Sequence, residues 1–106
     1  MLNQIVVCGR ISSITAKKLD GKEVQEVVLA IPRSYKNADG EYDTDFIPFI
    51  LTGGIASNTL EYCKTGDIVG VKGRIQSLEA KDGKHPFYLI AEKVSFLSSK
   101  APEEEE

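Results

Sequence analysis

Three Asp-Gly pairs divide the chain and constrain its fold more than any other feature. They are Asp20-Gly21, Asp39-Gly40 and Asp82-Gly83, and each lies between runs rich in Val, Ile, Phe and Tyr. Asp-Gly tolerates the positive φ angles of tight hairpin turns, so each pair predicts a turn between two antiparallel strands. The flanking runs predict five strands, at residues 2–15, 24–32, 46–52, 67–78 and 87–97.

Proline and glycine inside the predicted strands add local constraints. Pro48 lies in the third strand, and it fits there only at an unpaired edge position or at a bulge, because proline has no N–H to donate. Gly70 and Gly73 lie in the fourth strand. Glycines at such positions let a small barrel bend sharply, so they favour a closed barrel.

The pattern changes between the third and fourth strands, over residues 54–66. Apolar residues recur there at the spacing of one helix face, and Gly66 is placed to cap the C-terminus of that helix; the apolar residues are Ile55, Ala56, Leu60 and Cys63. The order strand, strand, strand, helix, strand, strand is the topology of the OB-fold, an all-β five-stranded Greek-key barrel. An SH3-like or other small β-barrel is the alternative, but it does not predict a helix at this position.

The net charge of the chain depends on its last four residues. Thirteen Lys and Arg against sixteen Asp and Glu give a formal charge of −3. Residues 103–106 are all Glu, and without them 13 basic residues face 12 acidic ones, a charge of +1. A polyanionic ligand is therefore not excluded, although the electrostatic contribution to its binding is limited. We expect residues 1–97 to form one OB-fold domain and residues 98–106 a disordered acidic tail.

Motifs for catalysis and metal binding are absent from the sequence. His85 is the single histidine, and Cys8 and Cys63 form no Cys-x-x-Cys pair, so a zinc site lacks ligands. No Gly-x-Ser-x-Gly, Walker or dinucleotide-binding fingerprint occurs. We therefore expect a protein that is not an enzyme and has no metal or other cofactor. The two cysteines are expected to be buried free thiols, with a disulfide as the alternative.

The sequence predicts neither a membrane-spanning segment nor a signal peptide. Apolar runs reach five residues at most, whereas about 20 are needed to span a bilayer. The first residues do not resemble a signal peptide. We expect a cytoplasmic, nucleoid-associated protein with reduced thiols.

Aromatic residues around the second Asp-Gly pair suggest binding of single-stranded nucleic acid. The rings are Tyr35, Tyr42 and Phe46. Proteins that bind single strands combine a basic groove with aromatic rings on which unpaired bases stack, at ~1–3 kcal/mol per base. The alternative is that these rings simply pack on the barrel.

Basic residues lie beside these rings and on two of the predicted strands. Arg33 and Lys36 flank the first ring in the sequence. Arg10, Lys72 and Arg74 lie on the first and fourth strands, at positions that can share one barrel face. Such side chains can contact phosphates. The alternative is that they are solubilising charges on an outward face.

Three blocks of sequence point to a known family. Residues 2–11 read LNQIVVCGRI, residues 29–47 contain LAIPRSY, NADGE and DFI, and residues 64–75 read KTGDIVGVKGRI. In this order and spacing, over residues 1–97, they resemble the bacterial and phage single-stranded DNA-binding proteins. The resemblance implies an OB-fold subunit that binds single-stranded DNA or RNA without sequence specificity and has no catalytic activity. It also implies assembly through the first strand into dimers and commonly tetramers.

The resemblance also assigns roles to individual residues. Tyr35 and Phe46 fall where the family places base-stacking aromatics. The positions at or beside the family's phosphate contacts are Arg10, Arg33, Lys72 and Arg74. Thr52 and Ala80 depart from the pattern, because they stand where stacking aromatics are common. Since two stacking partners are missing, we expect weaker binding or a shorter footprint than is usual in the family.

Two hypotheses about function follow. The first is non-catalytic, sequence-independent binding of single-stranded DNA in replication, recombination and repair, by a homo-oligomer such as a homotetramer. The second is a primosomal-type OB-fold interaction subunit that assembles replication proteins and binds single strands weakly; the missing stacking residues and the short tail favour it. The apolar run at residues 5–7 indicates a first strand covered on both faces, by the core and by a second subunit, with a monomer as the alternative. Dimer against tetramer and DNA against RNA stay open.

Overall fold

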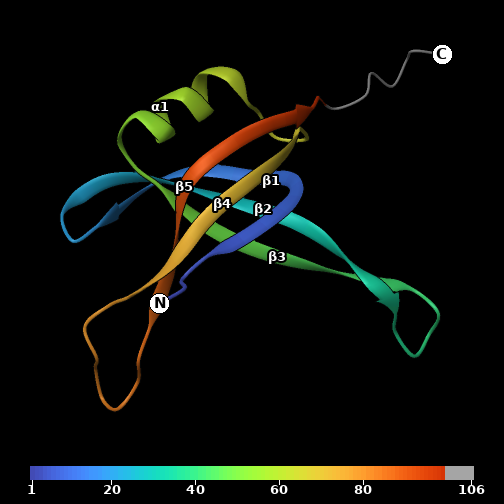
Figure 1. The fold of residues 1–106 in the computed structure, drawn as a ribbon, viewed down its shortest axis with the longest axis horizontal. Coiled ribbons are helices and arrows are strands. Elements are labelled where there is room, and N and C mark those ends of the chain that lie inside the picture. Colours follow the sequence, from blue (N-terminus) through green and yellow to red (C-terminus); the bar gives the residue numbers. More distant parts are fainter. Residues whose placement is uncertain (100–106) are drawn as a thin grey trace.

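The strands and the helix follow one another in the predicted order. The computed structural model describes residues 1–99, within which five strands and one helix occur. They are β1 (Ile5–Leu19), β2 (Lys22–Lys36), β3 (Tyr42–Leu51), α1 (Gly53–Tyr62), β4 (Ile68–Ser77) and β5 (Phe87–Ser98) (Figure 1). They form a closed barrel in the order β1-β2-β3-β5-β4, with β1 also paired to β4. The predicted OB-fold is confirmed.

The barrel closes through one parallel contact. All other neighbouring strands are antiparallel, but β3 and β5 run parallel and pair only at Ile50 and Ile90. Upstream of this point β3 pairs with β2 alone, so Pro48 lies on a free edge of β3, and no bulge occurs there. A proline inside a sheet is tolerated on such an edge strand, so the position agrees with the prediction.

The three Asp-Gly pairs all lie in strand-to-strand connections. Asp20 and Gly21 have φ of 53° and 77° and join the paired residues Leu19 and Lys22, so β1 and β2 run into the turn and are longer than predicted. Asp82 and Gly83 have φ of 52° and 74° within the β4–β5 hairpin. In the second pair only Gly40 has a positive φ, of 78°.

The core is formed by side chains that alternate along the strands. Val27 and Leu29 of β2 and Phe49 and Leu51 of β3 are buried against residues of the other strands. Gly73 of β4 lies beside a β-bulge, and a Cβ added there would collide with the carbonyl oxygen of Ile90. Glycine at this position therefore lets β4 and β5 approach closely, in agreement with its predicted part in closure.

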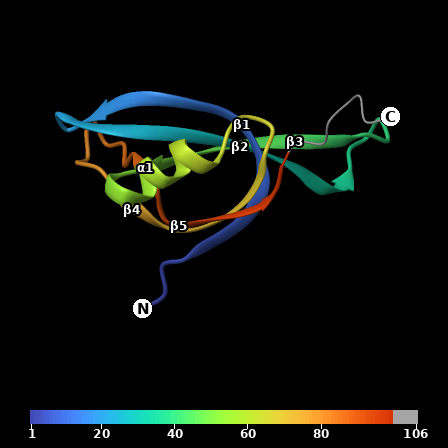
Figure 2. The same cartoon turned by 90° about the horizontal axis from the view of Figure 1, so that it is seen from above.

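The helix differs in two details from the prediction. It ends at Tyr62, and Cys63 in extended conformation is its C-cap, so Gly66 lies in the turn beyond and is not the cap. The buried helix residue is Thr59 and not Leu60, which is half exposed. At about 3.6 residues per turn, Thr59 falls on the same face as Ile55 and Cys63, and Leu60 falls beside it. Figure 2 shows α1 lying along the barrel strands.

The two cysteines are free thiols in different surroundings. Cys63 is buried, and burial raises the pKa of its thiol. Cys8 is exposed, so the prediction that both are buried is wrong for it. On β1 the odd-numbered residues 5 to 11 point into the barrel, and Cys8 lies on the outer face. The predicted acidic tail lies, from residue 100 onward, outside the described residues.

Candidate nucleic-acid interface

A row of cross-strand partners on the outer face of the barrel presents an exposed aromatic ring. Arg10 of β1 pairs with Ala30 of β2, and Ala30 pairs with Phe46 of β3. The Phe46 side chain is 59% exposed, whereas the alternation of β3 turns Phe49 into the core. Ala30 also lines a shallow hollow of about 340 Å³ on this face. A flat ring beside small side chains is suited to stacking an unpaired base.

Beyond Ala30 and Phe46, strands β2 and β3 leave the barrel as a two-stranded hairpin (Figure 1). Tyr35 and Tyr42 on this hairpin are 63% and 57% exposed. The Lys36 ammonium lies 5.8 Å from the centroid of the Tyr42 ring, its cross-strand partner, a cation–π distance. Asn37 shapes the turn, because its side-chain oxygen accepts hydrogen bonds from two backbone N–H groups, those of residues 39 and 41.

Arg33 lies in a bulge of β2, between the two predicted stacking rings in the hairpin. Pro32 pairs with Thr44 and Lys36 with Tyr42, so three residues of β2 face one residue of β3. The Arg33 guanidinium donates to Asp45 through Nη2 at 2.8 Å and Nε at 3.1 Å. These hydrogen bonds raise the pKa of Arg33 and lower that of Asp45. Asp43 adds an ion pair at 3.6 Å.

The other two predicted arginines also have protein partners. Arg10 donates from Nη1 to the carbonyl oxygen of Gly66 at 2.7 Å, which ties β1 to the turn before β4. Arg74 pairs through Nε with Glu92 at 3.3 Å and donates from Nη1 to Gln76 at 2.9 Å. Both arginines lie on the outer face of the barrel.

Lys72 differs from these arginines. It is exposed on β4, its cross-strand neighbours are Val6 and Lys93, and it has no ion-pair partner among residues 1–99. Its positive charge is therefore available to a ligand.

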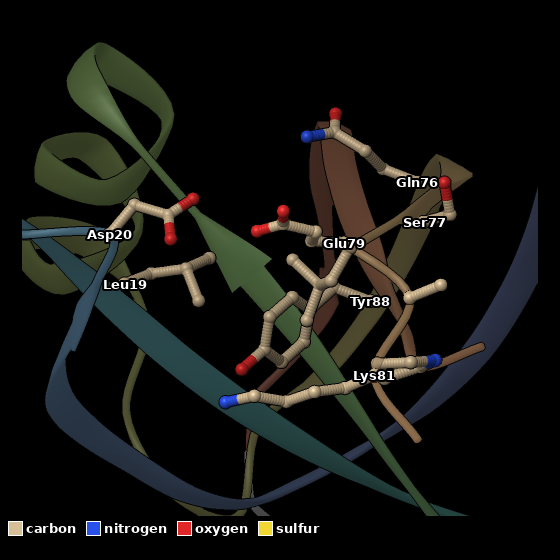
Figure 3. Close-up of a pocket in the computed structure, with 10 residues that line it drawn as sticks. Leu19, Asp20, Gln76, Ser77, Glu79, Lys81 and Tyr88 are labelled. Carbon is tan, nitrogen blue, oxygen red and sulfur yellow. The ribbon is translucent and has the colours of Figure 1, made fainter. Parts of the chain in front are cut away.

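A cavity that the sequence did not indicate lies between the β1–β2 turn and the β4–β5 hairpin. Its volume is about 600 Å³. Figure 3 shows the ring of Tyr88 in it, with the side chains of Asp20 and Glu79 extending into the space between the two loops and Lys81 along one side. In OB-folds these two loops often contact oligonucleotides. No local sequence motif marks Tyr88. Only this general property of OB-folds could have pointed to the cavity from the sequence.

Two features, a cluster of metal ligands and a membrane-spanning helix, are absent from the described part of the chain. Among residues 1–99, no group of three or more His, Cys, Asp or Glu side chains is arranged to hold a metal ion. The one helix found in this range is too short and too polar to cross a membrane.

Comparisons with known proteins agree with this geometry. The model of the Single-strand binding protein family matches residues 2–97. Single-stranded DNA-binding protein B of Bacillus subtilis is 37% identical over 97% of this chain and 96% of its own length. Single-stranded DNA-binding protein 3 of Listeria innocua is 35% identical, and the chain spans 66% of it.

A solved structure has the same fold. The Plasmodium falciparum SSB in complex with ssDNA superposes with a TM-score of 0.68 at 23% identity, over 92% of this chain and 96% of that one. The family match covers nearly all of the described residues, and it coincides with the barrel, the helix and the outer-face rings. The chain therefore belongs to the single-strand binding protein family.

Proposed function

We propose that this protein binds single-stranded DNA without sequence preference and without catalysis, in replication, recombination and repair. The observation that carries the proposal is the exposure of Tyr35 and Phe46 on one strand pair of a barrel that belongs to the single-strand binding protein family. The named relatives support the same activity. No comparison favours the primosomal-type interaction subunit. A protein with this activity acts in the cytoplasm at the nucleoid, where single-stranded DNA arises.

Each predicted site residue takes a role that its surroundings support. Tyr35 and Phe46 stack on bases, and Lys36 and Lys72 contact phosphates. Arg10 and Arg74 also contact phosphates, because a guanidinium has several N–H donors and their protein partners use only one or two of them. Arg33 links β2 to β3 within the hairpin through its ion pairs with Asp45 and Asp43.

The first strand is the proposed contact between subunits of a homo-oligomer. On its inner face Ile5 and Val7 pack against the core, while on its outer face Val6 is 67% exposed and Cys8 is exposed. A second copy would remove this apolar surface from water. Light scattering of the purified protein measures the number of subunits, and a monomer at all concentrations would contradict the proposal.

Titration with fluorescently labelled oligo(dT) tests the binding function. We expect saturable binding to oligo(dT), much weaker binding to duplex DNA, and lower affinity at higher salt. Tyr35→Ala and Phe46→Ala are each expected to lose ~1–3 kcal/mol, about 5- to 150-fold in affinity. Tyr62→Ala is the matched control, because Tyr62 is an equally exposed ring on α1, outside the proposed surface.

Two results would count against this assignment. If neither Tyr35→Ala nor Phe46→Ala differs from the Tyr62→Ala control, the rings do not form the binding surface. If the wild-type protein binds oligo(dT) only at millimolar concentration but captures a helicase or primase, the interaction-subunit hypothesis is correct instead.

A further inference from the structure

One cation in the proposed site, Arg33, is paired with two carboxylates. Arg33 donates three hydrogen bonds to Asp45, from Nε at 3.1 and 3.2 Å and from Nη2 at 2.8 Å. Asp43 approaches Nη1 at 3.6 Å. Two carboxylates and one guanidinium leave this group, which we call the Arg33 cluster, with a net charge of −1.

The Arg33 cluster lies on the two strands that carry both proposed stacking rings. Asp45 precedes Phe46 in β3, and Arg33 lies two residues before Tyr35 in β2. All three charged side chains are partly exposed. A strand that contacts both rings would cross the hairpin at the level of this cluster.

Asp45 occupies the edge of Arg33 that a phosphate would use. The Nε–Nη2 edge of a guanidinium binds two oxygens in parallel, and a carboxylate and a phosphate fit it in the same way. A phosphate must therefore displace Asp45, which loses its cation, and it then lies close to the negative charges of Asp45 and Asp43. This exchange is unfavourable compared with contact to a cation such as Lys72, which has no ion-pair partner among residues 1–99.

We propose that Asp45 sets the affinity and the salt dependence of DNA binding by keeping Arg33 from phosphate. The inference rests on the proposed function. The hairpin then binds DNA through its rings. Because Arg33 neutralises no phosphate, it causes no release of counterions from the DNA. Arg33, which the resemblance to the family places at or beside a phosphate contact, is in this chain an internal partner of Asp45.

The salt dependence of oligo(dT) affinity tests this inference. The isosteric change Asp45→Asn removes the carboxylate charge and frees Arg33, so we expect tighter binding at low salt. The slope of log affinity against log salt should steepen by about 0.7, the value for one additional phosphate contact on single-stranded DNA.

Three variants separate the release of Arg33 from a general charge effect. Asp43→Asn makes the same change in net charge but leaves the hydrogen bonds between Arg33 and Asp45, so its slope should stay at the wild-type value. The double variant Arg33→Gln/Asp45→Asn lacks the freed cation and should return to the wild-type slope. Arg33→Gln alone should also keep the wild-type slope. This measurement tests the inference even if Asp45→Asn proves unstable.

The outcomes distinguish the inference from the function on which it rests. If the wild-type protein does not bind oligo(dT), the proposed function itself fails. If it binds, an unchanged or shallower slope for Asp45→Asn overturns the inference. A slope that is shallower by about 0.7 in Arg33→Gln also overturns it, because Arg33 would then contact phosphate. Equal steepening in Asp43→Asn overturns it too, because the effect would be one of net charge.

Discussion

Two phenylalanines on β3, three residues apart, have opposite surroundings. Phe49 is fully buried in the barrel, whereas Phe46 is 59% exposed on the outer face. Downstream, β3 meets β5 at Ile50 and the barrel closes; upstream, it has only β2 as a partner. The same residue type therefore stabilises the core at one end of a strand and offers a ring to a ligand at the other.

The interior of the barrel and the hairpin also differ in the kind of side chain they contain. In the buried core cluster, eight of the nine residues are aliphatic or aromatic, and the ninth is Cys63. The hairpin beyond Phe46 contains the Arg33 cluster and the contact between Lys36 and Tyr42. The interior of the barrel is thus apolar, whereas the hairpin has no such interior and carries paired charges at its surface.

The largest expected effect separates the two phenylalanines by stability. Phe49→Ala should lower the free energy of unfolding by ~3–5 kcal/mol, because it removes a fully buried ring and leaves a cavity. Phe46→Ala should change it by no more than ~0.5 kcal/mol, since the ring is exposed. Urea denaturation followed by circular dichroism measures both. Equal losses would show that Phe46 belongs to the core.

An added ring tests how far the binding surface extends along β3. Thr52 directly follows β3 and is six residues after Phe46, an even number that would place both on the same face of the strand. It is exposed, and although it is the N-cap of α1 its side chain makes no capping hydrogen bond. Thr52→Trp should therefore cost little stability and increase the affinity for oligo(dT) by ~1–3 kcal/mol, about 5- to 150-fold.

The control for this gain is Thr65→Trp, because Thr65 is an exposed residue in the turn after α1. A similar gain from Thr65→Trp would mean that any surface tryptophan increases affinity. No gain from Thr52→Trp would place the end of β3 outside the interface.

The smallest expected effect is a shift in the pKa of Asp45 on the hairpin. The hydrogen bond from Arg33 lowers the pKa of Asp45 below its ordinary value of 3.8. A carboxyl with a lowered pKa stabilises the folded state above its unfolded pKa. This contribution is lost as the pH falls through the lower folded value.

Carboxyl-detected NMR titration measures this pKa directly. It should lie below 3.8 in the wild-type protein and rise in Arg33→Gln. An unshifted Asp45 in the wild-type protein would show that the ion pair is too weak in solution to keep Arg33 from phosphate.

Much of the fold could be predicted from local chemistry. The Asp-Gly pairs placed all three hairpins, because positive φ angles depend on the residues of the turn itself. The C-terminus of the helix was harder to predict. Gly66 is a residue type that caps helices, but its N–H donates to the carbonyl oxygen of Ile11. This contact exists only once β1 is in place. The burial of Thr59 in preference to Leu60 likewise depends on where the helix rests.

The residue types of the candidate site were predictable from the sequence. The exposure of its rings and the ion pairing of its arginines were less so. Tyr35 and Phe46 were placed correctly on the hairpin and on β3, but the apolar run at residues 46–51 obscures the alternation that exposes Phe46 and buries Phe49. The partners of the arginines were not foreseeable. Arg10 and Gly66 are 56 residues apart, and the Arg33–Asp45 pair requires the register of the β2–β3 bulge.

By itself, the sequence determined the turns, the order of strands and helix, and the residues able to stack on bases. These properties depend on neighbours in the chain and on short repeating patterns. Only the tertiary structure decided which phenylalanine is buried, and which positive charges remain available to phosphate. Burial and ion pairing depend on distances between segments that are far apart in sequence, and closure of the barrel sets those distances.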